Sequence, residues 1–277
     1  MARRKTNTTG AKNIICKWDS IFSFVDYCDT AKDNAVFKNS YKISQRKGGS
    51  WAGAESWEQA HDLLKNGDAD SMGKVNEYFV KFTKQATATA PRFRAAVAGA
   101  VPVVPAYLAG SPKSMLARQQ AKTRAKVLTV VYNVCADSEQ DADVLARTGA
   151  KFLAAVNAIE KSGCRLNIYM AVCSEKDREK VTFAVRVKTD GQRLNLMQIA
   201  YPLVNPSFLR RHYFKVIETN KKITSGYWPS TYGRPVHGTE GKDAITAAGM
   251  KFDTYLDYYE AKNMDTAAII KKLTAGK

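Results

Sequence analysis

The feature that most constrains this chain is the segment from Lys126 to Val187, which we interpret as the centre of an open α/β sheet. Val127 to Val134 is almost entirely β-branched or aromatic and does not alternate with polar residues, a pattern typical of a strand covered on both faces in a mainly parallel sheet. A polar loop reading NVCADS follows at residues 133–138. Because open α/β sheets place ligand sites at the carboxyl ends of such strands, this loop is a candidate site.

The residues after the loop predict a helix and two further strands. Leu145, Phe152, Leu153, Val156 and Ile159 share one helical face. Gly149 is expected to let this helix approach the sheet closely, and Gly163 to end it. Leu166 to Cys173 is then predicted to form the second strand. Val181 to Lys188 alternates apolar and polar residues, which favours an edge strand.

The remaining elements complete an α/β prediction. A short helix is expected over Asn195–Tyr201, ended by Pro202, and Asn205-Pro206 should begin another. A last strand is expected over Phe252–Tyr258, and a closing helix over Asp265–Leu273. The sequence therefore predicts a mainly parallel open sheet flanked by helices, Rossmann-like, with a helical N-terminal portion.

Composition divides the chain into four predicted parts. Residues 1–13 are polar and basic, which indicates a flexible arm, and residues 14–88 carry helical apolar spacings. Within the latter, Ser56 to Gln59 fits a capping box, and Trp51 and Trp57 are expected to pack against the helices. Residues 89–125 are rich in proline and glycine and predict an extended connector that lies against the core through its valines and Tyr107. Residues 126–277 form the α/β domain.

The chain carries none of the patterns of a secreted or membrane-spanning protein. The N-terminus has no hydrophobic region of the kind that a signal peptide requires. The apolar run over residues 95–109 is interrupted by Pro102 and Pro105. Five widely spaced cysteines indicate free thiols in a reducing compartment. We therefore expect a protein that is neither secreted nor bound to a membrane.

Two resemblances extend this reading. Residues 126–274 resemble a von Willebrand factor A-like domain, through VVYNVCADS, through the segment LARTGAKFLAAVNAIEKSGCRLNIYMAV, and through NPSFLRRHYFKVIE. The whole chain, including SWAGAESWEQAHDLLKNGD and PAYLAGSP, also resembles a family of uncharacterised bacteriophage proteins. The second resemblance implies a viral protein in the cytoplasm of an infected bacterial host or in the virion.

The A-like resemblance implies a metal site in the polar loop. In that family the loop reads D-x-S-x-S and binds Mg²⁺, and the corresponding positions here are Asn133, Cys135 and Asp137. An amide and a thiol thus replace a carboxylate and a hydroxyl, although Mg²⁺ prefers oxygen ligands. The alternative is a solvated acidic loop in which Asp141 or Asp143 lies at a helix N-terminus. We expect no cofactor, with Mg²⁺ as the alternative.

Common catalytic motifs are absent from the sequence. It contains no phosphate-binding loop, dinucleotide fingerprint, nucleophile elbow or H-E-x-x-H. Cys135 with His212 or His237 would make a nucleophile pair if the fold brought them together. Plain packing is the alternative, because free cysteines are usually buried. The sequence favours a non-catalytic protein.

The net charge of +17 favours polyanionic partners. Residues 1–125 carry 20 Lys and Arg against 10 Asp and Glu (+10), and residues 126–277 carry 23 against 16 (+7), so the excess is spread along the chain. One candidate nucleic-acid surface interleaves basic and aromatic residues: Arg210, Arg211, Lys215, Lys221, Lys222, Tyr227, Trp228 and Arg234. A second combines Arg118–Lys126 with the N-terminal arm. The alternative for the first is a helix and loop packed through Tyr213 and Trp228.

The functional hypothesis is a binding or scaffolding module that favours nucleic acid or a complex containing it. Three alternatives stay open. They are an assembly protein that contacts copies of itself or a virion component, a metal-dependent ligand-binding A-like domain, and an enzyme without a known motif.

Overall fold

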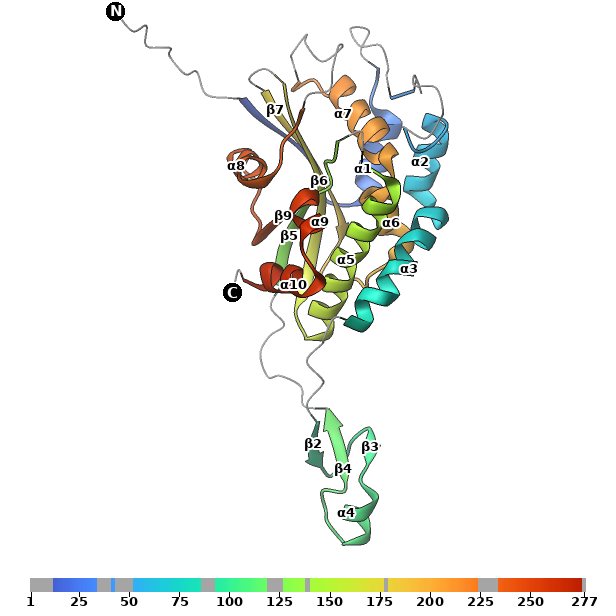
Figure 1. Cartoon of the computed structure of the whole chain (residues 1–277), viewed down its shortest axis with the longest axis vertical. Coiled ribbons are helices and arrows are strands. Elements are labelled where there is room, and N and C mark those ends of the chain that lie inside the picture. The colour runs from blue at the N-terminus through green and yellow to red at the C-terminus, as the bar shows by residue number, and fades with distance from the viewer. Residues whose placement is uncertain are drawn as a thin grey trace, which may run out of the picture.

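The computed structural model describes residues 12–33, 41–42, 52–85, 93–118, 127–137, 140–176, 179–223 and 234–275 (Figure 1). The strands are β1 (Lys12–Trp18), β2 (Phe93–Ala96), β3 (Val101–Pro102), β4 (Met115–Arg118), β5 (Val127–Asn133), β6 (Arg165–Lys176), β7 (Glu179–Lys188), β8 (Arg234–Pro235) and β9 (Thr254–Asp257). The helices are α1 (Ile21–Thr30), α2 (Trp57–Asn66), α3 (Ala69–Gln85), α4 (Val104–Leu108), α5 (Ala142–Lys161), α6 (Leu196–Val204), the π-helix η1 (Phe208–Tyr213), α7 (Phe214–Thr219), α8 (Gly238–Ala247), α9 (Tyr258–Asn263) and α10 (Thr266–Thr274).

A mostly parallel sheet with the strand order β1-β7-β6-β5-β9 forms the centre of the fold. β5 pairs in parallel with both β6 and β9, and β1 pairs in parallel with β7. β6 and β7 are antiparallel, and the short β8 pairs with the Ser174–Glu175 end of β6. This confirms the predicted fold class, but the middle strand is β6, and β5 lies between β6 and the edge strand β9.

Both faces of β5 are covered, as its unbroken apolar sequence predicts. Leu128, Val130 and Tyr132 belong to the main core, and the Tyr132 ring stacks on Phe152 of α5 at 4.4 Å. Val131 points to the opposite face, where it packs with Ile245 of α8. Figure 1 shows α8 on one side of the sheet and α1, α3, α5 and α6 on the other. Burial on two faces explains why the strand shows no alternation.

Gly149 brings α5 close to α6, and not to the sheet as predicted. A Cβ atom at Gly149 would lie 2.8 Å from Leu203 Cγ and 2.9 Å from Val204 Cγ1, both side chains of α6. Pro202 lies inside α6, whereas we expected it to end the helix. The missing side chain at Gly149 therefore sets the distance between two helices that flank the carboxyl end of β5.

The N-terminal region is part of the large sheet. β1 covers residues that the sequence assigned partly to a flexible arm and partly to a helical portion, and its register runs from Lys12↔Glu179 to Trp18↔Val185. The prediction that β7 is an edge strand is therefore wrong, because β1 and β6 flank it. The apolar residues of α1, among them Phe24, share one core with β5 and β6.

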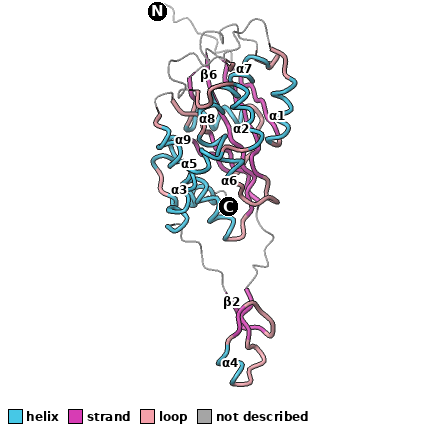
Figure 2. Tube along the Cα trace, turned by 90° about the vertical axis from the view of Figure 1, so that its right-hand side faces the viewer, coloured by secondary structure: helices cyan, strands magenta, loops and turns pink. Residues whose placement is uncertain are grey.

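The predicted connector is a small folded unit of its own. β2, β4 and β3 form a second, three-stranded antiparallel sheet, with α4 beside it (Figure 2). Its valines and Tyr107 do not lie against the core: Val97, Val104 and Tyr107 are 74%, 58% and 72% exposed. Among the described residues, no helix is long and apolar enough to cross a bilayer.

Candidate functional site

A pocket of about 330 Å³ opens at the carboxyl end of β5. Its walls come from the loop after β5, the start of α5, the end of α6 and η1, and they combine apolar and polar groups. Asp137 and Arg210, which the sequence assigned to two different candidate sites, both line it. The volume falls in the range of about 300–1,000 Å³ that is common for ligand pockets. The pocket therefore borders the loop that the sequence proposed as a candidate ligand site.

Two of the three predicted metal ligands are turned into the protein. Asn133 is fully buried, and its Nδ2 donates to the carbonyl of Val236 at 2.8 Å and to the hydroxyl of Tyr255 at 3.0 Å. Its Oδ1 accepts from the amide of Cys135 at 3.1 Å. Cys135 is itself buried. The amide at position 133 thus ties the loop to β9 and to the segment after β8.

The acidic residues of the loop have structural partners. Asp137 is exposed and accepts a hydrogen bond from the hydroxyl of Tyr259. Asp141 caps α5 by accepting from the amide of Asp143 at 2.6 Å, as its position at a helix N-terminus predicts. Asp143 accepts from the hydroxyl of Tyr78 at 2.6 Å. In the part of the chain that the structure covers, no three His, Cys, Asp or Glu residues are grouped so that they could hold a metal ion.

The described contacts of Cys135 and the histidines do not support the nucleophile pair that the sequence left open. Burial raises the pKa of the Cys135 thiol, which disfavours the thiolate. His212 lies in η1 with its Nδ1 2.9 Å from the Tyr201 hydroxyl, and the exposed His237 packs its ring on Tyr259. Packing, the alternative left open by the sequence, is the role that Cys135 has.

The prediction that Arg211 contacts nucleic acid is wrong. Its side chain is 1% exposed, although it belongs to a basic run in the sequence. The guanidinium donates to the carbonyls of Tyr41, Ala54 and Glu55 at 2.8, 2.9 and 3.0 Å. The guanidinium thus binds backbone carbonyls about 160 residues earlier in the chain, and not the phosphates that the sequence suggested. The π-helical turn of η1 buries Arg211, His212 and Tyr213 in succession.

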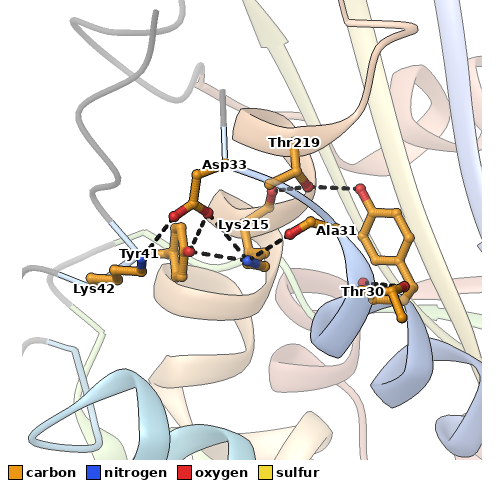
Figure 3. A network of polar contacts seen from close by, with 8 residues as sticks. Thr30, Ala31, Asp33, Tyr41, Lys42, Lys215 and Thr219 are labelled. Carbon is orange, nitrogen blue, oxygen red and sulfur yellow. Dashed lines mark hydrogen bonds and ion pairs between the residues drawn. The ribbon is translucent and has the colours of Figure 1, made fainter. Parts of the chain in front are cut away.

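Lys215 is also buried, so its assignment to the nucleic-acid surface is wrong too. Its Nζ donates to the hydroxyl of Tyr41 at 3.0 Å and lies 3.4 Å from Asp33 Oδ1 (Figure 3). The ammonium group also lies over the rings of Tyr41 and Trp57, at 4.5 and 5.5 Å. The bonds to Asp33 from Lys42, Tyr41 and Lys215 hold the pKa of that carboxyl at about 2, against the opposing effect of desolvation.

The other residues of the first candidate surface differ in exposure and in their partners. Lys221 and Lys222 are exposed at the turn after α7. Arg234 is exposed but paired, with its Nη2 2.7 Å from Glu175 Oε2 and 3.2 Å from Glu240 Oε1. Arg210 lines the pocket. Tyr227 and Trp228 lie outside the described residues, as does Trp51. Among the described members of this set, Arg211 and Lys215 are buried, Arg234 is paired, and Lys221 and Lys222 are exposed.

Arg118–Lys126, which the second candidate surface combined with the N-terminal arm, lies within a longer segment of concentrated positive charge. Residues 86–126 hold seven basic residues and no acidic residue, which gives 7 of the 17 net charges: Arg92, Arg94, Lys113, Arg118, Lys122, Arg124 and Lys126. The described part of this basic segment is the small sheet with α4. None of residues 93–117 is buried. A charge count in a sliding window could have found this segment from the sequence.

The mostly parallel open sheet with helices on both faces defines a Rossmann-like α/β protein. The sequence model of one family, described as "Domain of unknown function (DUF7192)", matches residues 3–275, so the chain belongs to this family. The match includes the small sheet as well as the large one. No curated protein and no solved structure matches the chain.

Proposed function

We propose that the protein binds nucleic acid, and that it does so through the basic segment of residues 86–126. The observation that carries the proposal is the charge of +7 in this segment, without a single acidic residue. Arg94 and Lys113 lie on the exposed small sheet with α4. A polyanion would gain attraction from each of these charges and would release counterions on binding.

Exposed rings favour a single strand as the ligand. Phe93 in β2 and Tyr107 in α4 are 47% and 72% exposed, and both lie within the basic segment. Single-stranded nucleic acid offers phosphates to basic residues and unpaired bases to aromatic rings. A duplex offers the phosphates but hides the faces of its bases. We therefore expect the protein to prefer single strands to duplexes of the same length.

The charge count predicts how the affinity depends on salt. If all seven basic residues contact phosphates, the slope of log K against log salt concentration is about −5 for a single strand, at about −0.7 for each contact. The affinity should then fall roughly a thousandfold between about 50 and 200 mM salt. Fluorescence anisotropy with a labelled oligonucleotide measures both the affinity and the slope.

Matched charge variants test which surface binds. Replacing Lys122, Arg124 and Lys126 by Ser should weaken binding and reduce the slope by about 2, since three contacts are removed. The control replaces Lys221, Lys222 and Lys251, all exposed, and should retain the slope of the unchanged chain. Equal losses in the two triple variants would mean that binding follows total charge. Absence of binding at low salt would exclude the function.

Two broader interpretations remain proposals. The order β5, polar loop, α5, β6 and β7 supports an A-like domain, because that succession is the opening of such a domain. The resemblance to bacteriophage proteins supports a viral protein that acts in the cytoplasm of an infected bacterial host or in the virion. Binding to nucleic acid agrees with either location.

A further inference from the structure

We propose that the pocket at the carboxyl end of β5 binds a free α-amino acid with an apolar side chain. The inference does not depend on nucleic-acid binding, because the described walls of the pocket come from residues 134–145 and 202–210, outside the basic segment. It rests on two groups of opposite charge, an amide of fixed orientation and several apolar side chains, which all line the same cavity. An amino acid of this kind carries an ammonium, a carboxylate and an apolar side chain on one carbon atom.

The pocket lies where an open α/β sheet binds its ligands. Sheets of this class bind ligands in the crevice outside the carboxyl ends of their strands. Two parts of the chain form the walls here: the loop after β5 with the start of α5, and the end of α6 with η1. At about 330 Å³ the cavity lies at the lower end of the usual range for ligand pockets. Its size therefore suits a small molecule.

Asp137 provides a carboxylate that is held in place. The Tyr259 hydroxyl donates to Asp137 Oδ2, and the backbone amide of Asp137 donates to the Tyr259 oxygen at 3.0 Å. These two bonds fix the position of the residue although its side chain is exposed. Within the described part of the chain, Asp137 Oδ1 has no hydrogen-bond partner. This oxygen can accept a charge-assisted hydrogen bond from an ammonium group.

Gln140 and Arg210 provide the donors for a carboxylate. The Gln140 Oε1 atom accepts from the Tyr258 hydroxyl and from Lys262 Nζ, each at 3.0 Å. An atom that accepts from two donors is the amide oxygen, so the hydrogens of Nε2 stay without a partner among the described residues. Arg210 adds a positive charge on the side of η1. Both side chains are half-buried, where a bond to a charged ligand group is stronger than in water.

The two charges of the lining disfavour ligands that carry a single charge. An anion in the pocket would take water from Asp137 without giving it a partner, and a cation would do the same to Arg210. A ligand that carries both charges compensates both residues. The opposite charges therefore select a zwitterion against simple acids and simple amines.

The rest of the lining is apolar or already bonded. Asn205 donates from Nδ2 to Asp68 at 2.8 Å and accepts at Oδ1 from the amide of Ser207 at 2.9 Å, so it belongs to the framework of the pocket. Large apolar side chains from α5, α6 and η1 make up much of the remaining wall: Leu145, Leu203, Val204, Phe208 and Leu209. Contact with these groups favours a ligand that brings its own apolar side chain. Leucine and phenylalanine have the required chemistry.

Calorimetric titration of the nuclease-treated protein tests the site. The probes are L-phenylalanine, 3-phenylpropionate, which lacks the ammonium, and 2-phenylethylamine, which lacks the carboxylate. L-Phenylalanine should bind at least about tenfold more tightly than either analogue, because each analogue lacks one charge-assisted hydrogen bond. Equal affinities for the three compounds would overturn the proposal. So would the absence of binding of both L-phenylalanine and L-leucine, by calorimetry and by thermal unfolding.

Single variants test which residue holds which charge. Asp137→Asn should bind 3-phenylpropionate at least as tightly as L-phenylalanine, because it has lost the acceptor for the ammonium. Arg210→Gln should show the corresponding change toward 2-phenylethylamine. The matched controls are Asp243→Asn and Arg193→Gln, both at exposed positions outside the pocket lining, and both should keep the preference of the unchanged protein.

Thermal unfolding without ligand shows whether each variant is folded. The Asp137→Asn substitution keeps the size of the side chain and an oxygen that can accept from the Tyr259 hydroxyl, so this variant should fold. An unchanged preference for L-phenylalanine in folded Asp137→Asn would overturn the proposal. A control variant that lost the preference would overturn it as well, because the selection would then follow the charge of the whole protein.

Discussion

The Tyr201 hydroxyl and His212 Nδ1 lie 2.9 Å apart in the interior, which joins α6 to the π-helix η1. Both side chains are fully buried. The imidazole is enclosed by Trp57 and Phe24, whose ring centroids lie 5.0 and 5.7 Å away. Desolvation, with a smaller contribution from His61, lowers the pKa of His212 to about 3. The folded protein therefore holds this histidine neutral.

This burial predicts that the stability falls in mild acid. An unfolded His212 titrates near 6.5, above its folded pKa of about 3. Between these values the unfolded chain binds more protons, so the free energy of unfolding decreases as the pH falls, by up to about 1.4 kcal/mol per pH unit. The pKa of His61 is also lowered by desolvation, which adds in the same direction. Urea titrations between pH 7 and about 5.5 measure the slope before ordinary carboxylates titrate.

The control compares how steeply the free energy of unfolding depends on pH in the unchanged protein and in His212→Gln, and not their absolute stabilities. His212→Gln loses part of the packing, but it should also lose most of the pH dependence in this interval. A variant with an unchanged slope would contradict the assignment to His212.

Arg211 should be required for stability and not for affinity. Arg211→Met leaves the carbonyls of Tyr41, Ala54 and Glu55 without their donor, so we expect a loss of about 3 kcal/mol or more. Lys222→Met, at an exposed position, should stay within about 0.5 kcal/mol. Denaturant unfolding measures both. A stable Arg211→Met protein with weakened oligonucleotide binding would restore the role that the sequence suggested.

The misassigned basic residues show which information a sequence lacks. Arg211 and Lys215 occur in a run that also contains exposed or half-buried residues, so composition alone gives them all the same role. Their burial depends on Tyr41 and Asp33, which lie 170 to 182 residues earlier in the chain. The strand β5 was predictable because its burial on two faces is encoded in its own residues.

The errors in the sheet have a similar cause. β7 alternates apolar and polar residues as an edge strand would. It is nevertheless paired on that side by β1, from the N-terminal part of the chain. The small residues Ala184 and Thr182 of β7 are buried opposite the main core. Their small or polar side chains had suggested an exposed face, so the sequence did not reveal that this face is buried. For the candidate site, Asp137 and the basic segment could be found from the sequence. The pocket could not, because α6 and η1 supply much of its wall.

Gly149 and Gly73 should respond to alanine in opposite ways. A Cβ at Gly149 would lie within 3 Å of Leu203 and Val204, and overpacking of this kind costs about 1–3 kcal/mol. At Gly73 in α3 a Cβ would meet nothing within 4 Å. Gly73→Ala should therefore stabilise the protein by about 0.5–1 kcal/mol, as expected inside a helix. Thermal unfolding of the two variants checks the opposite signs, and a neutral Gly149→Ala would contradict the close approach of α5 to α6.

The cysteines should differ sharply in reactivity. Burial raises the pKa of Cys16 and Cys173 to about 11 and raises that of Cys28 and Cys135 as well. Cys164 is half-buried immediately before β6. A thiol reagent at neutral pH should modify one cysteine quickly in the folded protein and all five after denaturation. Cys164→Ser should remove the fast phase. Rapid reaction of Cys135 would contradict this prediction and would support a role for Cys135 as a nucleophile.

Lys188 and Glu160 should show the asymmetry of a buried ion pair. The Lys188 side chain is 1% exposed, and its Nζ lies 2.5 Å from Glu160 Oε1, which links β7 to α5. Glu160→Leu leaves the ammonium group with the carbonyls of Thr189 and Leu166 as its remaining partners. We expect a loss of about 3–5 kcal/mol, because an uncompensated buried charge is costly.

The double variant separates charge from packing. Lys188→Met combined with Glu160→Leu removes both charges and keeps apolar volume, so it should be more stable than Glu160→Leu alone. A double-mutant cycle in urea gives the coupling free energy, which should exceed about 1 kcal/mol for a pair in direct contact. Additive effects of the two single variants would mean that solvent screens the pair. The Lys188 ammonium would then not be held in the interior between β7 and α5.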